Sequence, residues 1–341
     1  MAGLKPITIA GGGLAGLSLG LGLRKHGVPV ELHEAGSYPR HRVCGEFISG
    51  LRDGVIDRLD LGDSLSDALQ HRSTTWYVRD RKVLEAALPE PARGISRYAL
   101  DERLGRLLIA NGGRVIENSR IRTPEAEGLV WAAGRRLEKS SDWLGLKAHF
   151  SGYPLRDQLE MHAGNGAYLG ISPVEEGYVN VCGLFKRRDG ISASGAELLK
   201  EYLRQSGLGT LAGVLDSSQF RPDSFVGVSA IAFGRQAQSQ DVCALGDAEW
   251  VIPPFTGNGM TMAFESADGA LPHLVEFAEG RIEWSAALAR IRHCLQRRFR
   301  DRIRVASCLH PFLYTRTGQF ALSLMSRTHL LPFNLLYRGL R

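Results

Sequence analysis

The first 33 residues alternate between short apolar runs and one longer apolar segment rich in small residues. Residues 6–10 are expected to form a β-strand that stops at Gly11, residues 14–26 a helix that ends before Gly27, and residues 28–33 a second strand. A strand, a helix and a strand within about thirty residues are the unit of a doubly wound parallel sheet. We therefore predict an α/β fold that begins with a Rossmann-like domain.

Further along the chain, the pattern changes to the alternation that is typical of half-buried strands. The runs at 74–78 and 83–88 flank a polar turn at 79–82, and a second pair follows at 168–172 and 178–185. Residues 149–188 and 220–234 share this antiparallel character. Helices are expected at 100–111 and 195–205, buried strands at 128–134 and 241–245, and helical structure after residue 283.

These changes of period divide the chain into a parallel-sheet domain and an inserted domain. The length of 341 residues also exceeds the size at which a single hydrophobic core keeps growing. We assign residues 1–72, 96–148 and 236–283 to the parallel-sheet domain and residues 73–95 and 149–235 to an inserted antiparallel-sheet domain. Residues 284–341 form a helical C-terminus in this prediction.

Composition narrows the class of protein. Hydrophobic residues make up 44% of the chain and charged residues 23%, which is typical of soluble globular proteins. The five cysteines include no C-x-x-C pair, which argues against a disulfide framework and a structural metal site. We expect no metal, a reducing compartment and a cytoplasmic location. No apolar run reaches the length of a membrane span.

Positive charge is concentrated towards the end of the chain. The net charge is +6, and seven arginines lie between Arg290 and Arg304. A solvated helix face is the simpler interpretation, and a docking surface for anionic lipid or an acidic carrier protein is the other. Apolar runs at 311–314 and 330–337 pack on the parallel-sheet domain or form a peripheral membrane surface, with arginines spaced among them: Arg316, Arg327, Arg338 and Arg341. Nucleic acid is not expected as a partner, because no aromatic platform accompanies the arginines.

The segment from Gly11 to Gly16 has glycines at the three positions of a dinucleotide-binding fingerprint, Gly11, Gly13 and Gly16. The first allows a tight turn, the second lets a pyrophosphate approach, and the third allows close packing of helix on strand. The helix N-terminus at Leu14 and Ala15 offers free N–H groups to phosphate. Glu34 follows 18 residues after the last glycine, and its carboxylate can accept hydrogen bonds from the hydroxyls of a ribose. Ala35, the next residue, is expected at the same site. NAD and FAD both satisfy this fingerprint.

A second glycine-rich block favours FAD. A strand leads into Gly246-Asp247, a turn at Pro253-Pro254 follows, and Gly257-Asn258-Gly259 opens a helix. Together the two blocks resemble the flavoprotein monooxygenase and geranylgeranyl reductase-like superfamily. The resemblance implies that Asp247 binds the ribityl chain of FAD and that Pro254, a candidate catalytic residue, lies beside the isoalloxazine. It also implies that the helix N-terminus at Asn258, Gly259 and Met260 faces the pyrimidine edge, where a helix dipole stabilises reduced flavin.

Three shorter segments extend the resemblance. Arg97 begins a segment similar to the family's R-x-x-L helix start, which implies contact with FAD. Arg42, Cys44 and Gly45 resemble a loop of the reductase-like branch that reaches the flavin. There Arg40 and Arg42 would neutralise pyrophosphate, and Cys44, with a pKa lowered by these arginines, is a candidate catalytic residue. Ala133-Gly134 lies at the cofactor in place of the Asp-Gly of the hydroxylases, a departure that puts direct reduction by NADPH in doubt.

The resemblance implies an FAD-dependent oxidoreductase with NADPH or NADH as electron donor, and two reactions fit it. A monooxygenase would hydroxylate or epoxidise a lipophilic or aromatic molecule through a flavin C4a-hydroperoxide, whereas an ene-reductase would reduce the alkene of an isoprenoid or a similar substrate. We expect the monooxygenase. The W-x-W-x-I-P signature of the halogenase branch is absent. A non-catalytic flavin-binding, membrane-docking protein is the alternative from another class. Substrate-lining candidates are Trp76, Tyr168, Tyr178 and Phe185.

Overall fold

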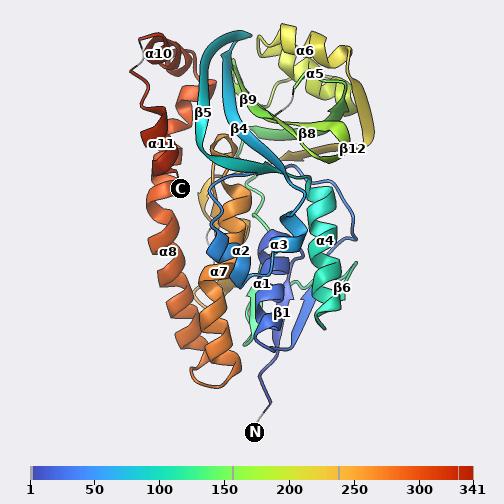
Figure 1. Ribbon diagram of the computed structural model, residues 1–341, viewed down its shortest axis with the longest axis vertical. Coiled ribbons are helices and arrows are strands. Elements are labelled where there is room, and N and C mark those ends of the chain that lie inside the picture. The colour runs from blue at the N-terminus through green and yellow to red at the C-terminus, as the bar shows by residue number, and fades with distance from the viewer. Residues whose placement is uncertain (1–2, 156, 237–238, 329, 341) are drawn as a thin grey trace.

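The chain forms two lobes, one above the other, with a long C-terminal helix along their side (Figure 1). The structure is a computed structural model that describes residues 3–155, 157–236, 239–328 and 330–340. The lower lobe holds a parallel sheet, and the upper lobe holds a larger, curled sheet. Within the described ranges, no helix combines the length and the apolar character that a membrane span requires.

The lower lobe is built on five parallel strands in the order β14-β7-β1-β2-β6. The predicted strand, helix and strand are β1 (Ile7–Ala10), α1 (Leu14–Lys25) and β2 (Val30–His33). The remaining strands are β6 (Arg114–Ile116), β7 (Leu129–Trp131) and β14 (Cys243–Ala244). Two further helices, α4 (Arg97–Ala110) and α7 (Gly259–Ala278), share one hydrophobic core with α1 and the sheet. The predicted Rossmann-like α/β fold is therefore confirmed for this part of the chain.

The upper lobe is built on eight strands in the order β12-β8-β11-β10-β9-β4-β5-β3. All neighbouring pairs are antiparallel except β4 and β9, which run parallel, so the sheet is mixed where the sequence predicts a purely antiparallel one. Its strands are β3 (Phe47–Ile48), β4 (Leu69–Val78), β5 (Arg81–Gly94), β8 (Trp143–Ser151), β9 (Gln158–Gly164), β10 (Ala167–Pro173), β11 (Tyr178–Lys186) and β12 (Gln219–Ser229).

Both predicted hairpins are present, and the first is longer and tighter than expected. Its turn is the pair Arg79-Asp80, instead of the four residues 79–82. Both residues have positive φ, 48° and 61°, as a two-residue hairpin turn requires. The strands therefore extend to the turn on both sides, and polar residues such as Arg81 and Lys82 belong to β5.

The two faces of the upper sheet have different neighbours. Helices α5 (Gly195–Gln205), which has the predicted bounds, and α6 (Gly209–Asp216) cover one face. Val181 and Phe185 of β11 point into the core under these helices. Because successive side chains of a strand alternate between faces, Cys182 and Leu184 point to the other side, towards the lower lobe.

The chain after residue 283 is helical, as predicted. Its helices are α8 (Trp284–Leu309), α9 (Pro311–Tyr314), α10 (Arg316–Arg327) and α11 (Phe333–Gly339). The smaller elements are α2 (Asp53–Arg58), α3 (Gly62–Leu65), β13 (Gly234–Arg235), β15 (Trp250–Val251) and the 3-10 turns η1 (Glu175–Gly177), η2 (Gly246–Ala248) and η3 (Pro254–Thr256).

The arginine-rich run on α8 is divided between the interior and the surface. Arg302 is buried and pairs with Glu265 at 2.6 Å, and Arg298 pairs with Asp268 at 3.1 Å. Both carboxylates belong to α7, so these arginines fasten α8 to the lower lobe. Arg297, Arg300 and Arg304 are exposed. The run as a whole is therefore not one continuous solvated face.

Two of the expected domain limits fall inside strands of the upper sheet. β4 begins at Leu69, where Gln70 and Arg72 obscure the strand pattern, and β8 begins at Trp143, before the expected limit at residue 149. β3, at residues 47–48, also joins the upper sheet by pairing with β5. The chain consequently crosses between the two sheets as many times as predicted, but two of these crossings come earlier in the sequence than the pattern of periods indicates.

Candidate functional site

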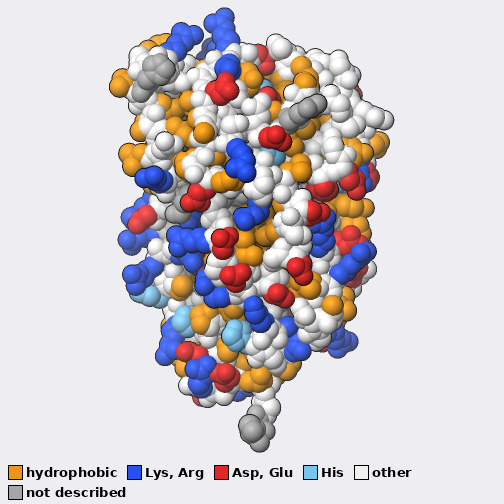
Figure 2. Space-filling model, viewed as in Figure 1, with side chains coloured by type: hydrophobic (Ala, Val, Ile, Leu, Met, Phe, Trp, Pro, Cys, Tyr) orange, Lys and Arg blue, Asp and Glu red, His pale blue; other side chains and the backbone are white. Residues whose placement is uncertain are grey.

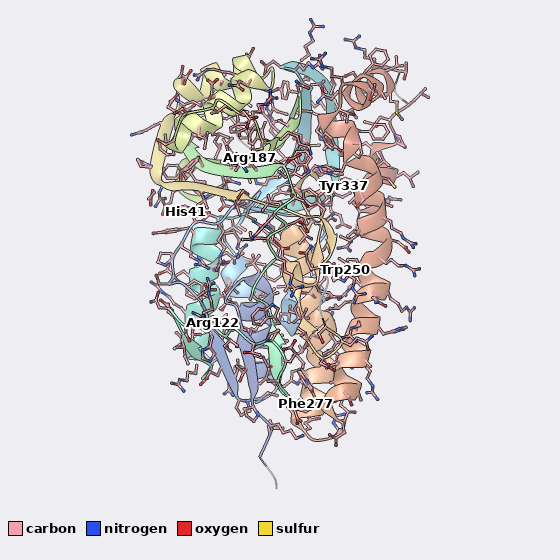
Figure 3. The ribbon with its side chains drawn as sticks, turned by 180° about the vertical axis from the view of Figure 1, so that it is seen from behind. His41, Arg122, Arg187, Trp250, Phe277 and Tyr337 are labelled. Atoms are coloured by element: carbon pink, nitrogen blue, oxygen red, sulfur yellow. The ribbon has the colours of Figure 1, made fainter. Side chains whose placement is uncertain are left out.

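A cavity of about 950 Å³ lies between the two lobes. Ala10, His33 and Trp131, the last residues of β1, β2 and β7, line it at the carboxyl edge of the parallel sheet. This edge, on both sides of β1, is where open α/β sheets bind their ligands. Figure 3 shows the cavity-lining residue His41 at the level where the lobes meet and Arg122, also a lining residue, further down beside the parallel sheet.

All the residues that the sequence predicts to bind the cofactor line this cavity, except Gly16 and Asn258. Gly16 lies inside α1, where a Cβ atom would meet the carbonyl oxygen of Gly11 at 2.1 Å, so its role is close packing. Asn258 is fully buried and donates from Nδ2 to the carbonyl oxygen of Leu340 at 2.6 Å. Its side chain therefore holds the C-terminal end of the chain to the start of α7, which the sequence alone does not indicate.

The glycine turn that opens α1 has space for a phosphate group. Gly11 has φ of +110°, and a Cβ there would meet the carbonyl oxygen of Ala132 at 2.3 Å. At Gly13, the N-cap of α1, the nearest atom to an added Cβ is Nη2 of Arg97, at 3.8 Å. No side chain caps this helix end, so its N–H groups are available to an anion.

The charge of the lining suits a dinucleotide. Among the described residues, two carboxylates line the cavity, Glu34 and Asp247. Six arginines line it as well: Arg40, Arg42, Arg97, Arg120, Arg122 and Arg135. Guanidinium groups bind phosphate oxygens with two hydrogen bonds each, and a concave basic surface raises the local concentration of anions. The residues present thus fit the pyrophosphate of FAD.

The carboxylate of Glu34 is already engaged by the chain itself. Its Oε2 accepts from the N–H of Gly12 at 2.8 Å and from Arg42 at 3.3 Å, and its Oε1 accepts from the N–H of Gly36 at 2.9 Å and from Arg40 at 2.6 Å. Burial alone would raise the pKa of Glu34, but these cations and N–H groups hold it below its usual value. A carboxylate has about four acceptor positions. A ribose can therefore bind Glu34 only if at least one arginine moves aside.

The second glycine block begins beside the first, because a Cβ added at Gly246 would lie 3.0 Å from Cβ of Ala15. Gly246 and Asp247 form η2, and the turn η3 presents Pro254 before the start of α7 at Gly259. Asp247 makes no hydrogen bond to any residue within the described ranges. Burial raises its pKa, and the charges of Arg135 and Arg97 offset this only partly. An unpartnered carboxyl group in a lined cavity fits the hydroxyls of a ribityl chain.

Arg97 lines the cavity from the first turn of α4, where Ser96 caps the helix by accepting from the N–H of Ala99. Its guanidinium makes two hydrogen bonds of 2.7 Å to the buried carboxylate of Asp101, one turn later. Arg42 donates to the same carboxylate at 3.0 Å. Asp101 thus orients two of the arginines that face the cavity.

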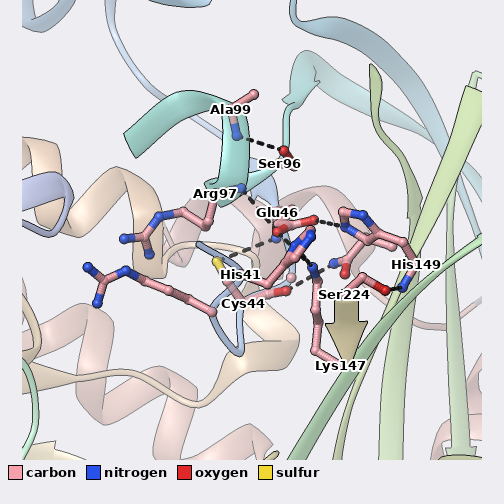
Figure 4. Close-up of polar contacts among 12 residues, drawn as sticks. His41, Cys44, Glu46, Ser96, Arg97, Ala99, Lys147, His149 and Ser224 are labelled. Atoms are coloured by element: carbon pink, nitrogen blue, oxygen red, sulfur yellow. Dashed lines mark hydrogen bonds and ion pairs between the residues drawn. The ribbon is translucent and has the colours of Figure 1, made fainter. Parts of the chain in front are cut away.

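The loop from His41 to Glu46 is fixed by a buried polar cluster, hereafter the Glu46 cluster, which consists of His41, Glu46, Lys147 and His149 (Figure 4). Glu46 accepts from Nε2 of His149 at 2.6 Å, and Nζ of Lys147 lies 3.3 Å from Glu46 and 2.8 Å from Nδ1 of His41. The N–H of Arg97 donates to Glu46 at 3.0 Å. Although burial alone would raise the pKa of Glu46, Lys147 and His149 hold it below its usual value.

His41, Glu46 and His149 also have the spacing of metal ligands. The ammonium group of Lys147, however, contacts two of these three residues and supplies the positive charge that a metal ion would bring. Burial and the charge of Lys147 lower the pKa of His41 to about 4, which keeps its ring neutral. The cluster is therefore an ion pair between Glu46 and Lys147, with the imidazole of His149 bonded to Glu46 and that of His41 bonded to Lys147.

The pKa of Cys44 contradicts the expectation from the sequence. Burial raises it, and the nearby charge of Arg97 does not compensate, so the thiol is neutral at physiological pH rather than activated. Cys182 lines the same cavity, and burial raises its pKa further. Cys182 was not predicted from the sequence, although its position in β11, one residue from the core residue Val181, is a signal for a side chain on the opposite face.

Of the four substrate-lining candidates, only Tyr168 lines the cavity. Phe185 lies on the opposite face of the sheet, packed against Tyr202 of α5 at a ring distance of 5.3 Å. Tyr178 packs beside His149, and Trp76 packs against the apolar cluster that contains Met161 and Tyr168 without lining the cavity itself. The upper wall is formed instead by side chains that the sequence did not single out: Leu159, Met161, Leu184, Ile231, Phe233 and Phe255.

Solved structures of flavoproteins share this fold. The chain superposes on PqsL of Pseudomonas aeruginosa, solved in complex with 2-aminobenzoylacetate, with a TM-score of 0.74 and 14% identity over 94% of this chain and 99% of that one. For a geranylgeranyl bacteriochlorophyll reductase-like protein from Thermoplasma acidophilum the TM-score is 0.76, with 18% identity over 96% and 91% of the two chains. For the halogenase PltM the TM-score is 0.74, with 16% identity over 94% and 79%.

No protein-family model matches the chain, and no curated protein is significantly similar to it in sequence. The similarity to the solved structures therefore lies in the course of the backbone. It agrees with the resemblance on which the sequence analysis relied, because that resemblance named both monooxygenases and geranylgeranyl reductase-like proteins. The chain has the α/β fold of these flavoproteins, with a cavity at the carboxyl edge of its parallel sheet.

Proposed function

We propose that the protein is an FAD-dependent oxidoreductase that oxygenates a lipophilic small molecule. One observation carries the proposal: a single cavity joins the glycine turn, the six arginines and Asp247 to an apolar wall from the upper sheet. The basic part suits the diphosphate and ribityl groups of FAD, and the apolar part suits a substrate. PqsL, described as "a probable FAD-dependent monooxygenase", has the same backbone fold and supports the assignment.

The residues that would hold FAD follow from their positions. Gly13 and the N-terminus of α1 would receive the pyrophosphate, Asp247 the ribityl hydroxyls, and the N-terminus of α7 at Gly259 the pyrimidine edge. Bound FAD supplies the redox chemistry, either activation of dioxygen or transfer of hydride. The chain's own residues orient the substrate and exclude water, which Tyr168, Phe255 and Leu184 do at the upper wall.

A second reaction, reduction of an alkene, is favoured by one specific observation. Two thiols, Cys44 and Cys182, line the cavity in their neutral form. A neutral thiol can donate its proton to the carbon next to the one that receives hydride, and solvent then returns a proton to the thiolate. A neutral thiol is also slow to be oxidised, since thiolate is the reactive form, so the same residues are compatible with oxygenation.

The deciding experiment is anaerobic reduction of the FAD-loaded protein, tested with NADPH, NADH and light, followed by addition of dioxygen. We expect oxygen to be consumed and the flavin spectrum to pass through a species distinct from its reduced and oxidised forms. Slow reoxidation without such a species would favour alkene reduction. Failure to bind FAD would overturn both proposals.

A matched variant separates the two reactions further. Cys44→Ser is expected to leave oxygen consumption nearly unchanged, whereas a reductase that uses the thiol as its acid should lose about tenfold or more in turnover of an alkene substrate. Flavin content, measured by absorbance, must be the same in both proteins for the comparison to hold.

A further inference from the structure

The last forty residues carry an outward-facing apolar surface. Phe320, Leu324, Leu330 and Leu335 are 51–71% exposed, and Phe312 is 39% exposed. These residues belong to α9, α10 and α11 or to the segment between the last two helices. Figure 2 shows hydrophobic side chains beside basic ones at the corner of the molecule where α10 lies in Figure 1. Single exposed apolar residues are ordinary, but a group of this kind indicates an interaction site.

In α10 large apolar side chains face the solvent and a polar side chain faces the interior, which is the reverse of a normal surface helix. Phe320 and Leu324, one turn apart, face outward, whereas Gln319 is buried and its Nε2 donates to the carbonyl oxygens of Gly164 and Leu313 at 2.6 and 2.8 Å. Leu322 supplies the apolar contact on the inner side. The helix is thus held in place by its own polar and apolar contacts while large apolar side chains remain in water.

The charge carried by the C-terminal segment itself has one sign. Residues 302–341 contain six arginines and neither aspartate nor glutamate. Arg316, Arg327 and Arg338 are exposed among the apolar residues, whereas Arg341 lies outside the described residues. Ser326 donates to the carbonyl oxygen of Val83, which brings the end of α10 next to the β4–β5 hairpin and its exposed Arg79. Of the acidic residues on that hairpin, Asp80 accepts from the N–H of Thr210 at 2.7 Å, Glu85 pairs with Lys82 at 2.6 Å, and Glu90 is exposed.

We propose that the outward side of α10, the C-terminal docking face (Arg316, Phe320, Leu324 and Arg327, at spacings of three or four residues, with the exposed Phe312, Leu330, Leu335 and Arg338 in the neighbouring segments), binds the surface of an anionic lipid bilayer. Apolar side chains that enter the acyl boundary beside arginines that contact headgroups are the composition of a peripheral membrane surface. A symmetric pairing of two copies would place the same arginines against one another, and their repulsion disfavours it.

The inner side of the same segment contacts the apolar end of the cavity. Leu313 and Leu322 lie in one cluster with Met161 and Tyr168, which line the cavity wall. If the protein acts on a lipophilic substrate as proposed above, docking brings this end of the cavity close to the phase in which such a molecule dissolves. Membrane binding itself depends only on the outer side chains and not on the flavin.

The test is flotation of the purified protein with phosphatidylcholine vesicles, with and without phosphatidylglycerol, at low and high salt. We expect binding to the anionic vesicles at low salt and its loss at high salt. Each of Phe320→Ser and Leu324→Ser should lower the partition coefficient about tenfold. Each of Arg316→Gln and Arg327→Gln should lower it about fivefold, the effect expected for one basic residue at an anionic surface.

Matched control variants lie on α4, away from this face (Figure 1). Ile109 is 56% exposed, close to the 51% of Leu324, and the side chain of Arg106 is 77% exposed. Ile109→Ser and Arg106→Gln should leave binding unchanged. Flavin-free protein should float as well as flavin-loaded protein, so failure of the proposed redox function would not affect this result.

Three outcomes would overturn the proposal. Absence of flotation with anionic vesicles at low salt would exclude a lipid surface. Equal losses in the α4 control variants would mean that binding is unspecific. A concentration-dependent dimer in light scattering that Phe320→Ser abolishes, without flotation, would assign the face to a second copy of the chain.

Discussion

Gly11 and Gly13 are two residues apart, yet a side chain added at Gly11 would disturb the fold, whereas one added at Gly13 would only fill the space of a ligand. Gly13 has φ of −89°, which any residue adopts, and an added Cβ would meet nothing closer than 3.8 Å. Gly11 has φ of +110°, and an added Cβ would overlap the backbone of Ala132. The first glycine is therefore required by the fold, whereas the second is required only by a ligand.

We therefore expect Gly13→Val to fold with a near-normal melting temperature and to be purified without flavin, because the side chain fills the space of the pyrophosphate. Gly11→Val should be destabilised by at least about 2 kcal/mol through backbone strain and overlap. Thermal denaturation and flavin absorbance distinguish the two. A yellow, fully loaded Gly13→Val protein would contradict the assignment of the glycine turn.

At the scale of elements, the Glu46 cluster joins the 41–46 loop, α4 and β8 into one unit. Glu46, in the loop, has φ of +53°, an unusual conformation for a residue with a side chain, and its carboxylate contacts both α4 and β8. The neighbouring carbonyl oxygens of Cys44 and Gly45 accept from Asn180 and Ser172, each at 2.9 Å. The loop that lines the cavity is thus fixed to the upper sheet at successive residues.

A double-mutant cycle tests the cluster as an ion pair. Glu46→Gln should cost about 3–5 kcal/mol of unfolding free energy, because it leaves the ammonium group of Lys147 buried without its counter-charge. Lys147→Met should cost a similar amount, and the double variant should cost less than the sum. Urea denaturation measures all three. Strict additivity would mean that the two side chains do not interact.

Features that depend only on a short segment of the chain could be predicted from the sequence. The turns at Gly11–Gly16 and Gly246–Gly259 were predictable because each glycine meets a requirement of its own short segment. The Glu46 cluster was not, because Lys147 is about a hundred residues from Glu46 and only the pairing of β8 within the upper sheet brings them together. Phe185 shows a different limit. The alternation of side chains along a strand correctly places Phe185 and Leu184 on opposite faces of the sheet, but no local signal indicates which face of β11 meets the cavity.

At the scale of the whole molecule, two buried histidines and the half-buried His41 make stability depend on pH. Burial is the largest cause that lowers the pKa of His41, His71 and His310, each to about 4. Between this value and the ordinary value of about 6.5, the unfolded chain binds protons that the folded chain does not. The folded state is therefore fully stabilised above pH 6.5 and loses this contribution as the pH falls towards 4.

We expect the free energy of unfolding, measured by urea denaturation, to decrease steadily between pH 7 and pH 5. His71 is fully buried and bonds the carbonyl oxygen of Pro173 through Nε2. His71→Gln should reduce the slope of stability against pH, and the same substitution at the exposed His26 should not. An unchanged slope in His71→Gln would show that this histidine is protonated in the folded protein.

The strand order of the lower lobe has a consequence for biosynthesis. The central strand β1 is made first, but its neighbour β7 follows at residues 129–131, and α7, which packs on α1, ends only at residue 278. At ordinary rates of translation, roughly 10–50 s separate the emergence of α1 from that of α7. During this interval the leucines of α1 have no complete core to enter. Nascent chains of this protein should therefore be long-lived clients of ribosome-associated chaperones, and the cavity can form only after Ala263, the last residue of its lining, has left the ribosome.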